Sequence, residues 1–228
     1  MSASSGALAL FDLDHTLIPF DSGMAWTQFL IAREVLPHEA EATYLAFCHQ
    51  YAAGTLDIHA MHRNNLLPLL GHSRETLAQW QREFEVTMAP NIPAGMRELV
   101  KRHQAAGDLC AIVTATTRLI AQPFARLFGI EHLLSTQAAT LDGRLDGALT
   151  GEIAGEPCYR ENKIAHVERW LGALRREGGI SHFATSWFYS DSMSDLPLLE
   201  AVTRPVAVQP DDRLRAVAAA RGWPVLAT

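Results

Sequence analysis

Short apolar runs that stop abruptly at polar residues are the feature that most limits how this chain can fold. Four of them, at residues 7–11, 109–113, 187–189 and 205–208, contain only apolar and aromatic residues. Runs of this length are typical of strands that are buried on both faces, in a parallel sheet covered by helices on each side. We therefore predict that these four runs form the centre of such a sheet.

Segments with helical periodicity lie between the runs in the second half of the chain. Residues 96–106, 119–128 and 163–174 carry apolar positions at helical spacing, and the first two segments each stop at a glycine. Strand and helix alternate from about residue 93 onward. This alternation predicts an α/β fold with a doubly wound parallel sheet.

One long segment interrupts the alternation directly after the first strand. From about residue 21 to residue 90 the apolar positions recur at helical spacing, without a convincing strand pattern. We predict two domains: an α/β core domain of residues 1–20 and 91–228, and a small helical cap domain of residues 21–90. An insertion at this place overhangs the carboxyl ends of the strands, where open α/β sheets bind ligands. In the core domain, the Asp142-Gly143 pair predicts a β-hairpin.

Charge and cysteine content argue against several classes of function. The chain has 19 Lys and Arg residues against 25 Asp and Glu residues, a net charge of −6. This charge disfavours nucleic-acid binding, which needs clustered positive side chains. No apolar run approaches the roughly 20 residues that cross a bilayer, so no membrane partner is expected. Three cysteines without CxxC spacing are typical of reduced thiols, which predicts a cytoplasmic protein.

Polar side chains follow the predicted strands or begin the predicted helices, and six of them form a candidate site. They share a place at one rim of the predicted sheet: Asp12, Asp14, Thr114, Lys163, Asp191 and Asp195. Asp12 and Asp14 stand two residues apart in an extended segment, so both carboxylates point to the same side. Asp191 and Asp195 share a face if their turn is helical.

Taken singly, each of these residues has an ordinary structural explanation. A lone D-x-D pair is more often a turn and a helix cap, and a lone threonine after a strand is more often an N-cap. Together, however, the six residues place four carboxylates, a hydroxyl and an ammonium at one rim. Carboxylate oxygens in that number favour Mg²⁺, while a hydroxyl, a lysine and turn amides favour a phosphate. The combination predicts phosphoryl transfer.

The order of these motifs resembles a known family. Residues 11–17, Phe-Asp-Leu-Asp-His-Thr-Leu, are similar to the first motif, D-x-D-x-T-L, of the haloacid dehalogenase superfamily of phosphatases. Thr114, Lys163 and residues 190–195 match its later motifs in order and approximate spacing. The helical insertion resembles the cap of the phosphoserine phosphatase-like branch, subfamily IB. The resemblance covers nearly the whole chain and implies a Mg²⁺-dependent phosphomonoesterase.

The resemblance also implies a role for each motif residue. Asp12 would attack the substrate phosphorus and become an aspartyl phosphate. Asp14 would protonate the leaving alkoxide and then take a proton from the hydrolytic water. Thr114 and Lys163 would bind phosphoryl oxygens and neutralise charge.

A metal site follows from the same resemblance. The Asp12 carboxylate, the Asp14 backbone carbonyl and Asp191 would hold Mg²⁺, and Asp195 would complete or orient that set of ligands. Ser194 stands where the phosphoserine enzymes usually have Asn, so we expect one hydrogen bond of the phosphate loop to differ.

The sequence differs from the phosphoserine enzymes at a second place, and this difference and two residues of the predicted cap bear on which substrate binds. Residues 115–117, Ala-Thr-Thr, replace glycines of the phosphoserine enzymes, so we expect the substrate to approach differently. Asp21 and Arg63 align with the acid and the arginine by which those enzymes hold the amino and carboxylate groups. A guanidinium suits a carboxylate and an aspartate suits an ammonium, although a surface ion pair is the alternative for both. Phosphoserine and histidinol phosphate are the candidate substrates, and only the former offers a carboxylate to Arg63.

Other functions fit part of this pattern. A phosphoacceptor signalling module of the receiver type also combines an acidic Mg²⁺ pocket with a phosphorylated aspartate, a hydroxyl and a lysine. Such modules lack a helical insertion and an aspartate two residues after the nucleophile, so Asp14 discriminates between the two functions. A phosphotransferase that uses the same aspartyl phosphate is a further alternative. The sequence leaves the oligomeric state open.

Overall fold

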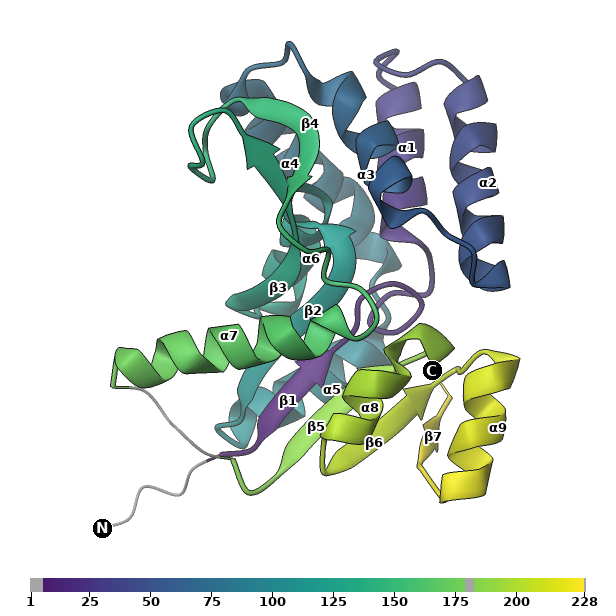
Figure 1. The fold of residues 1–228 in the computed structure, drawn as a ribbon, viewed down its shortest axis with the longest axis vertical. Helices are drawn as coiled ribbons and strands as arrows, with labels where there is room; N and C mark the ends of the chain where they lie inside the picture. Colours follow the sequence, from purple (N-terminus) through teal and green to yellow (C-terminus); the bar gives the residue numbers. More distant parts are fainter. Residues whose placement is uncertain (1–5, 179–182, 228) are drawn as a thin grey trace.

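A seven-stranded sheet organises the structure, a computed structural model that describes residues 6–178 and 183–227 (Figure 1). The strands are β1 (Leu8–Phe11), β2 (Leu109–Thr117), β3 (His132–Thr140), β4 (Leu149–Ala154), β5 (Ser186–Ser190), β6 (Arg204–Val208) and β7 (Val225–Leu226). Their order across the sheet is β4-β3-β2-β1-β5-β6-β7. All neighbouring strands are parallel except β3 and β4, which pair antiparallel. The predicted α/β fold with a doubly wound sheet is confirmed.

The helices lie in the connections between strands, and α1 to α5 all lie between β1 and β2. They are α1 (Ser22–Ile31), α2 (Glu39–Ala53), α3 (Ile58–Leu66), α4 (Arg74–Met88), α5 (Ala94–Ala105), α6 (Arg118–Phe128), α7 (Asn162–Arg176), α8 (Leu196–Ala201) and α9 (Asp212–Arg221). Short 3₁₀ turns are η1 (Leu67–Leu69), η2 (Ala89–Asn91) and η3 (Met193–Asp195). Along the described ranges, no helix combines the length and the apolar character needed to cross a bilayer.

Side chains that alternate along the central strands bury both faces of the sheet. Ala9 and Phe11 of β1 point to one face and join a hydrophobic cluster with α5 and α6. Leu8 and Leu10 point to the other face and join a second cluster with α7, α8 and α9. Burial on both faces is the reason that the runs in the sequence are apolar throughout instead of alternating.

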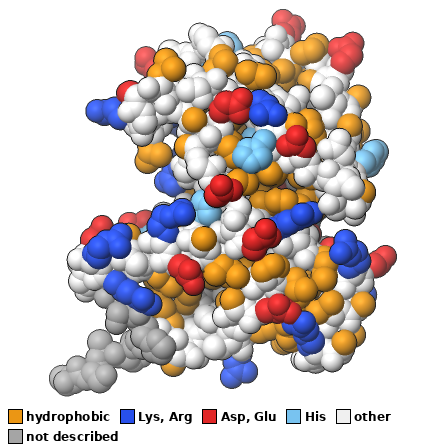
Figure 2. Space-filling view, in the orientation of Figure 1, with side chains coloured by type: hydrophobic (Ala, Val, Ile, Leu, Met, Phe, Trp, Pro, Cys, Tyr) orange, Lys and Arg blue, Asp and Glu red, His pale blue; other side chains and the backbone are white. Residues whose placement is uncertain are grey.

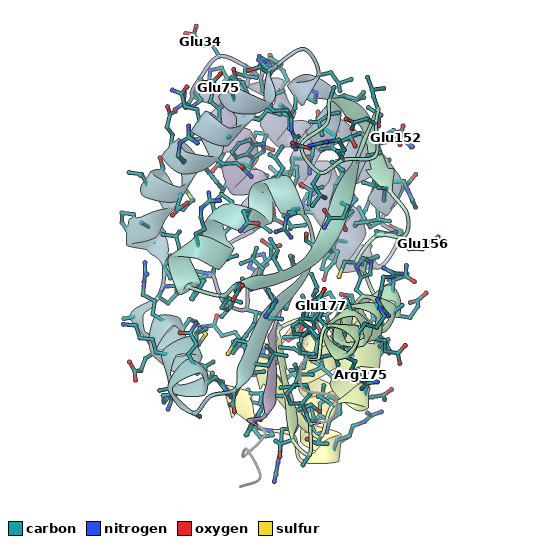
Figure 3. The ribbon with its side chains drawn as sticks, turned by 90° about the vertical axis from the view of Figure 1, so that its left-hand side faces the viewer. Glu34, Glu75, Glu152, Glu156, Arg175 and Glu177 are labelled. Atoms are coloured by element: carbon teal, nitrogen blue, oxygen red, sulfur yellow. The ribbon has the colours of Figure 1, made fainter. Side chains whose placement is uncertain are left out.

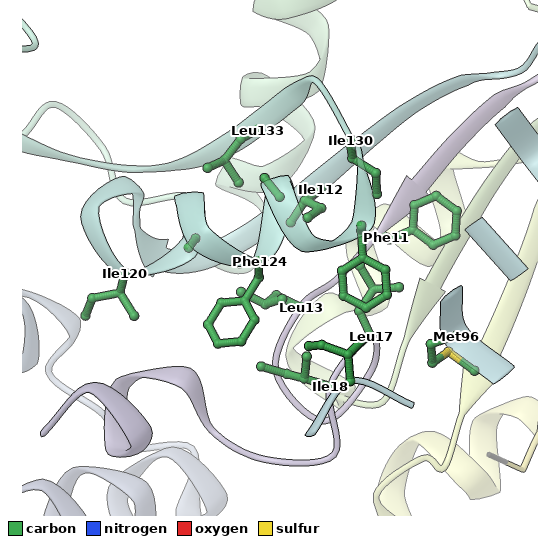
Figure 4. Close-up of a cluster of buried hydrophobic side chains, with 14 of the residues drawn as sticks. Phe11, Leu13, Leu17, Ile18, Met96, Ile112, Ile120, Phe124, Ile130 and Leu133 are labelled. Atoms are coloured by element: carbon green, nitrogen blue, oxygen red, sulfur yellow. The ribbon is translucent and has the colours of Figure 1, made fainter. Parts of the chain in front are cut away.

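The four helices α1 to α4 follow β1 and lie together beyond the carboxyl ends of the strands (Figure 1). Asp21, Asp57 and Ser73 begin α1, α3 and α4, and each side chain accepts a hydrogen bond from the first turn. Trp26 of α1 and Phe84 of α4 are buried in the same cluster as residues of β1 and α6. These helices therefore pack against the sheet through continuous apolar contacts. Figure 4 shows the part of this cluster that lies around Leu13 and Phe124, next to the sheet.

The predicted β-hairpin is confirmed by the antiparallel pair β3–β4, but two strands are longer than the sequence-based expectations. Strand β3 begins at His132, ahead of the predicted hairpin, and its pairing with β4 brings Thr140 opposite Leu149. The Asp142-Gly143 pair lies in the connection between these strands, where Gly143 has a φ of 73°. Strand β2 continues beyond residue 113 to Thr117, with an irregular register between Thr114 and Thr117.

On the face shown in Figure 2, Lys and Arg side chains are interspersed with Asp and Glu side chains.

Candidate active site

The candidate site lies where the carboxyl ends of β1, β2 and β5 meet the helices α1 to α3. A cavity of about 280 Å³ elsewhere lies between α4, α6 and the β3–β4 connection, but the sequence-predicted residues surround a different cavity of about 260 Å³. We call the latter the inner cavity. Six of the eight predicted site residues line it: Asp12, Asp14, Asp21, Thr114, Lys163 and Asp191. The parallel strands bring the five core residues of this set together although up to 179 positions separate them in the chain.

Lys163 is the centre of the charge arrangement. Its Nζ donates to Asp12 Oδ1 at 2.9 Å and to Asp195 Oδ2 at 2.7 Å, and the residue is only 2% exposed. Burial alone would lower the pKa of Lys163, but the carboxylates of Asp12 and Asp195 outweigh burial and raise it above its ordinary value. The lysine is therefore held as a cation beside Asp12.

Asp195 acts through this lysine instead of facing the inner cavity. Its Oδ2 accepts from Lys163 and from Ser190 Oγ at 2.8 Å, and it does not line the cavity. Its Oδ1 is buried and has no hydrogen-bond partner among the described residues. Of the two roles expected for Asp195, the geometry favours orienting the site over direct contact with a metal.

Asp14 is held at the junction between β1 and α1. Its Oδ1 accepts from the Ser22 backbone N–H at 2.6 Å, and its Oδ2 accepts from Thr116 Oγ1 at 2.8 Å. Thr114, which is buried, accepts from the Thr116 backbone N–H at 3.1 Å. Thr116 thus connects Thr114 to Asp14 and fixes how the Asp14 carboxylate faces the cavity.

Asp191 is fixed by a reciprocal pair of hydrogen bonds with Thr16. The Thr16 hydroxyl donates to Asp191 Oδ1 at 3.0 Å and accepts from the Asp191 backbone N–H at 3.0 Å. Burial raises the pKa of Asp191 to about 7, and the charge of Asp195 adds to the rise.

The residues present fit a magnesium ion. Burial, together with repulsion from Asp191 and Asp195, raises the pKa of Asp12 well above its usual range despite the nearby Lys163. Two buried carboxylates contact the Lys163 ammonium and Asp191 lines the same cavity, which leaves an excess of negative charge that a divalent cation would offset. Within residues 6–178 and 183–227, no three His, Cys, Asp or Glu side chains are grouped as metal ligands. That is compatible with Mg²⁺, which binds through one or two carboxylates and keeps several waters or substrate oxygens.

Asp21 lies at the helical end of the inner cavity. It caps α1 by accepting from the Met24 backbone N–H at 2.7 Å, and it accepts from the Tyr44 hydroxyl at 2.9 Å. A Cβ atom on Gly23 would collide with that hydroxyl, so the glycine lets Tyr44 reach Asp21. Burial raises the pKa of Asp21 to about 6, and the charge of Asp14 adds to the rise.

Arg63 does not lie at the inner cavity, contrary to expectation. Its side chain is 43% exposed and its Nη1 lies 3.4 Å from Glu152 Oε2. Figure 3 shows Glu152 at the outside of the molecule, beside β4. Met61 of the same helix lines the cavity, and two helical positions correspond to a rotation of about 200°. Arg63 therefore points away from the site, and the surface ion pair is the role that the structure gives it.

The rest of the helical end is apolar and aromatic. Its wall is formed by Tyr44, Phe47, Cys48, Tyr51, Ala52, Leu56, Ile58 and Met61. Among the described residues that line the cavity, the basic side chains are Lys163 and His15, both contributed by the core.

A sequence model of the haloacid dehalogenase-like hydrolase family matches residues 9–200. The chain belongs to this family. The match includes every motif residue from Asp12 to Asp195, so the resemblance of the motifs is confirmed at the level of the family.

Two curated relatives of this hydrolase are phosphatases by name. A histidinol-phosphatase of Neisseria meningitidis serogroup C (strain 8013) is 42% identical over 96% of this chain and 97% of its own length. A phosphoserine phosphatase of Mycobacterium tuberculosis (strain H37Rv) is 34% identical over 96% of this chain and 70% of its own length. This chain is accordingly a phosphatase of the haloacid dehalogenase-like family, as expected, and the receiver-type alternative is not supported.

Solved structures share the fold of this phosphatase. A protein of unknown function from Bordetella pertussis Tohama I is 42% identical and superimposes with a TM-score of 0.86, over 98% of this chain and 99% of that one. A phosphoserine phosphatase solved with bound substrate has a TM-score of 0.64 at 18% identity, over 94% of this chain and 91% of that one. At that identity the likeness shows the fold alone.

Three residues that orient the predicted carboxylates by hydrogen bonds were not identified from the sequence. Tyr44, Thr16 and Thr116 each bond one of the predicted carboxylates. Thr16 belongs to the D-x-D-x-T-L motif, so its place in that motif was the available clue. Tyr44 is twenty-three positions from Asp21 on another helix, and its partner depends on how α1 and α2 pack.

Proposed function

We propose that this chain is a Mg²⁺-dependent phosphomonoesterase that acts on an amino-alcohol phosphate through an aspartyl phosphate on Asp12, with histidinol phosphate as the favoured substrate. The observation that carries the proposal is the chemical division of the inner cavity. Its core end gathers carboxylates, a hydroxyl and a lysine, while its helical end offers a single carboxylate among aromatic and aliphatic side chains.

The core end suits the two half-reactions of a covalent phosphatase. A carboxylate oxygen of Asp12 bonds to phosphorus as the ester P–O bond breaks, and Asp14 gives a proton to the leaving alkoxide. Water then attacks the phosphorus and gives a proton to Asp14, which releases inorganic phosphate and restores Asp12. The hydrogen bonds from Ser22 and Thr116 keep the Asp14 carboxylate oriented for both proton transfers.

The negative charge of the phosphoryl group would be stabilised by Lys163, Thr114 and the metal. Lys163 lies 2.9 Å from Asp12, where it can also contact a phosphoryl oxygen, and the Thr114 hydroxyl lies at the same rim. Mg²⁺, held by the Asp12 and Asp191 carboxylates and the Asp14 backbone carbonyl, would offset repulsion between the nucleophile and the anionic ester. Asp195 holds Lys163 in place.

The helical end suits an ammonium and a ring. Asp21 is the acid that faces the cavity there, and the neighbouring wall is aromatic and aliphatic. A substrate carboxylate would meet Asp21 without a guanidinium beside it, because Arg63 lies outside the cavity. Histidinol phosphate brings an amine and an imidazole and no carboxylate, and the name of the Neisseria relative supports it. Phosphoserine stays the alternative, supported by the name of the Mycobacterium relative.

The test is a comparison of both esters with the purified protein. We expect kcat/KM for histidinol phosphate to exceed that for phosphoserine by about tenfold or more, since an unpaired carboxylate in the cavity is costly. EDTA should abolish release of inorganic phosphate, and added Mg²⁺ should restore it. A preference for phosphoserine would contradict the substrate, and metal-independent hydrolysis would contradict the cofactor. Transfer of phosphate to an added alcohol instead of water would identify the phosphotransferase alternative.

We also propose the domain division and the location of the protein. Residues 1–20 and 91–228 would form the α/β core domain and residues 21–90 the helical cap; residues 1–5, 179–182 and 228 lie outside the described part. The division is supported by the placement of α1 to α4 at one end of the sheet (Figure 1). A cytoplasmic location is supported by the three free thiols, Cys48, Cys110 and Cys158.

A further inference from the structure

Tyr51 stands between the inner cavity and a larger open groove on the outside of the molecule. It belongs to the last turn of α2, and its side chain lines both the inner cavity and the groove, which has a volume of about 850 Å³. Ala52, Tyr159, Asp191 and Ser194 also line both spaces. These five residues form the wall between the groove and the inner cavity, and we call this wall the partition. A substrate that moves from the groove to Asp12 would have to cross it.

The hydroxyl of Tyr51 is bonded across this partition to the core. It donates to Ser192 Oγ at 2.7 Å and lies 2.8 Å from Ser194 Oγ. The two serines are bonded to each other at 3.1 Å, and the Ser194 backbone N–H donates to Ser192 Oγ. One side chain of the helical segment is thus tied to the short loop that carries Asp191 and Asp195.

Further contacts continue from this loop to the reacting centre. The Ser192 backbone N–H donates to Ser190 Oγ, and Ser190 Oγ donates to Asp195 Oδ2. Asp195 in turn holds Lys163, which contacts Asp12. Tyr51 itself bonds none of these acids, so it acts on them only through the serines.

A second contact secures the same end of α2. Arg160 Nη2 donates to the Gly54 backbone carbonyl at 3.0 Å, and the rings of Tyr51 and Tyr159 lie 6.1 Å apart. The end of α2 therefore meets the core at two neighbouring points. Of these, the Tyr51 hydroxyl is the one that reaches the loop of the site.

From these contacts we propose that Tyr51 is a positioning residue of the phosphatase. Its hydroxyl holds the end of α2 against the loop of residues 190–195, which closes the partition and fixes Asp191 and Asp195. The substrate reaches the inner cavity when this contact opens. The effect on catalysis rests on the proposed function, whereas the closing of the partition does not.

The variant Tyr51→Phe tests the proposal because it removes the hydroxyl and keeps the ring. Cys48 lines the inner cavity, so its rate of alkylation by iodoacetamide reports how often the partition opens. Cys110 and Cys158 are buried and serve as internal references in the same digest. We expect Cys48 in Tyr51→Phe to be alkylated at least about threefold faster than in the wild type, since the lost hydrogen bond favours the open form.

Catalysis gives the second readout. With a chromogenic phosphate monoester and saturating Mg²⁺, we expect kcat of Tyr51→Phe to fall about tenfold while KM changes less than about twofold. Ser194→Ala should reduce kcat in the same direction, and the double variant should lose less than the product of the two single effects. Tyr189→Phe is the matched control, because it removes a buried tyrosine hydroxyl bonded to His103, away from the inner cavity. It should change neither kcat nor the alkylation of Cys48.

The two readouts separate failure of this proposal from failure of the proposed function. A wild-type protein without phosphatase activity would overturn the proposed function, and the alkylation of Cys48 would still decide whether Tyr51 closes the partition. Equal alkylation of Cys48 in the wild type and Tyr51→Phe would overturn the proposal. An unchanged kcat in Tyr51→Phe, with an active wild type, would overturn the positioning role.

Discussion

Lys163 shows how a single side chain can link three separate parts of the chain. Its ammonium lies between Asp12, at the end of β1, and Asp195, at the start of α8. A cation at the first turn of a helix is poorly placed with respect to the helix dipole, and the two carboxylates supply the compensation. Removing Lys163 would leave two buried carboxylates without their cation, which is more costly than the loss of one hydrogen bond.

Asp21 is predicted to select the amine of the substrate. Asp21→Asn keeps the cap of α1, because Asn also accepts from the first turn, but it removes the negative charge. We expect kcat/KM for histidinol phosphate to fall about 10- to 100-fold. With a phosphate ester that lacks an amine, the variant should match the wild type.

Arg63→Ala is the control on the same helical segment. Because Arg63 is exposed and its ion pair with Glu152 lies on the surface, we expect kcat/KM to stay within about twofold and unfolding free energy within about 0.5 kcal/mol. Steady-state kinetics and chemical denaturation measure both quantities. A large loss in Arg63→Ala, with an unaffected Asp21→Asn, would point to a carboxylate-bearing substrate instead.

The residues of the site could be predicted where the chain itself fixes their direction. Asp12 and Asp14 come directly after β1, Thr114 lies in the last part of β2, and Asp191 directly follows β5 in the same parallel sheet. Arg63 could not be placed in this way. Its direction depends on the rotation of α3 about its axis, which is set by packing of the buried face.

At the scale of the element, α3 carries a buried histidine that the site does not use. His62 is 1% exposed, lies on the same face as Ile58 and Leu66, and neither ring nitrogen has a hydrogen-bond partner among the described residues. Burial, aided by the nearby His59, lowers the pKa of His62 to about 4. The ring is therefore neutral near pH 7.

Stability should therefore fall in acid between about pH 6.5 and pH 4. In this window His62 is protonated in the unfolded chain but not in the folded chain. Protonation therefore stabilises the unfolded state relative to the folded state as pH falls. Between pH 7.5 and pH 5 we expect His62 to contribute a loss of about 2 kcal/mol. Urea denaturation of His62→Leu at both values measures it, because the variant should lose that much less stability than the wild type. Equal losses in the two proteins would contradict the buried neutral histidine.

Strands and helices could be predicted from the sequence where their apolar residues follow a single clear pattern. Strands β1, β2, β5 and β6 coincide with apolar runs, and α5, α6 and α7 with amphipathic segments. The first half of β3 was missed because His132 and Ser135 interrupt the apolar pattern. Strand β2 extends through three threonines and an alanine, whose strand conformation comes from pairing with β3 and not from apolar character.

At the scale of the whole molecule, one hydrophobic cluster joins the helical segment to the sheet. Phe84 of α4 is fully buried, and its ring lies 5.1 Å from Trp26 of α1 and 5.6 Å from Phe124 of α6. Packed aromatic rings hold α1 and α4 to α6, whereas the end of α2 is held mainly by hydrogen bonds to the core. Movement that opens the inner cavity is therefore expected at α2.

Phe84→Ala tests whether the two parts unfold together. Removing a buried aromatic ring should cost about 3–5 kcal/mol of unfolding free energy. Because the cluster is continuous, we expect one cooperative transition, shifted to lower denaturant, with the same midpoint by fluorescence and by circular dichroism. Two separate transitions, with only the first one shifted, would show that the helical segment unfolds independently.

Trapping of the phosphorylated protein tests the central claim most directly. After rapid acid quench with a ³²P-labelled phosphate ester and Mg²⁺, we predict label on Asp12, identified by peptide mapping. The label should be absent in Asp12→Asn and should persist in Asp14→Asn, where the acid–base group for hydrolysis is lost. Phosphate release by Asp12→Asn at the wild-type rate, with no labelled aspartate in the wild type, would contradict the covalent mechanism.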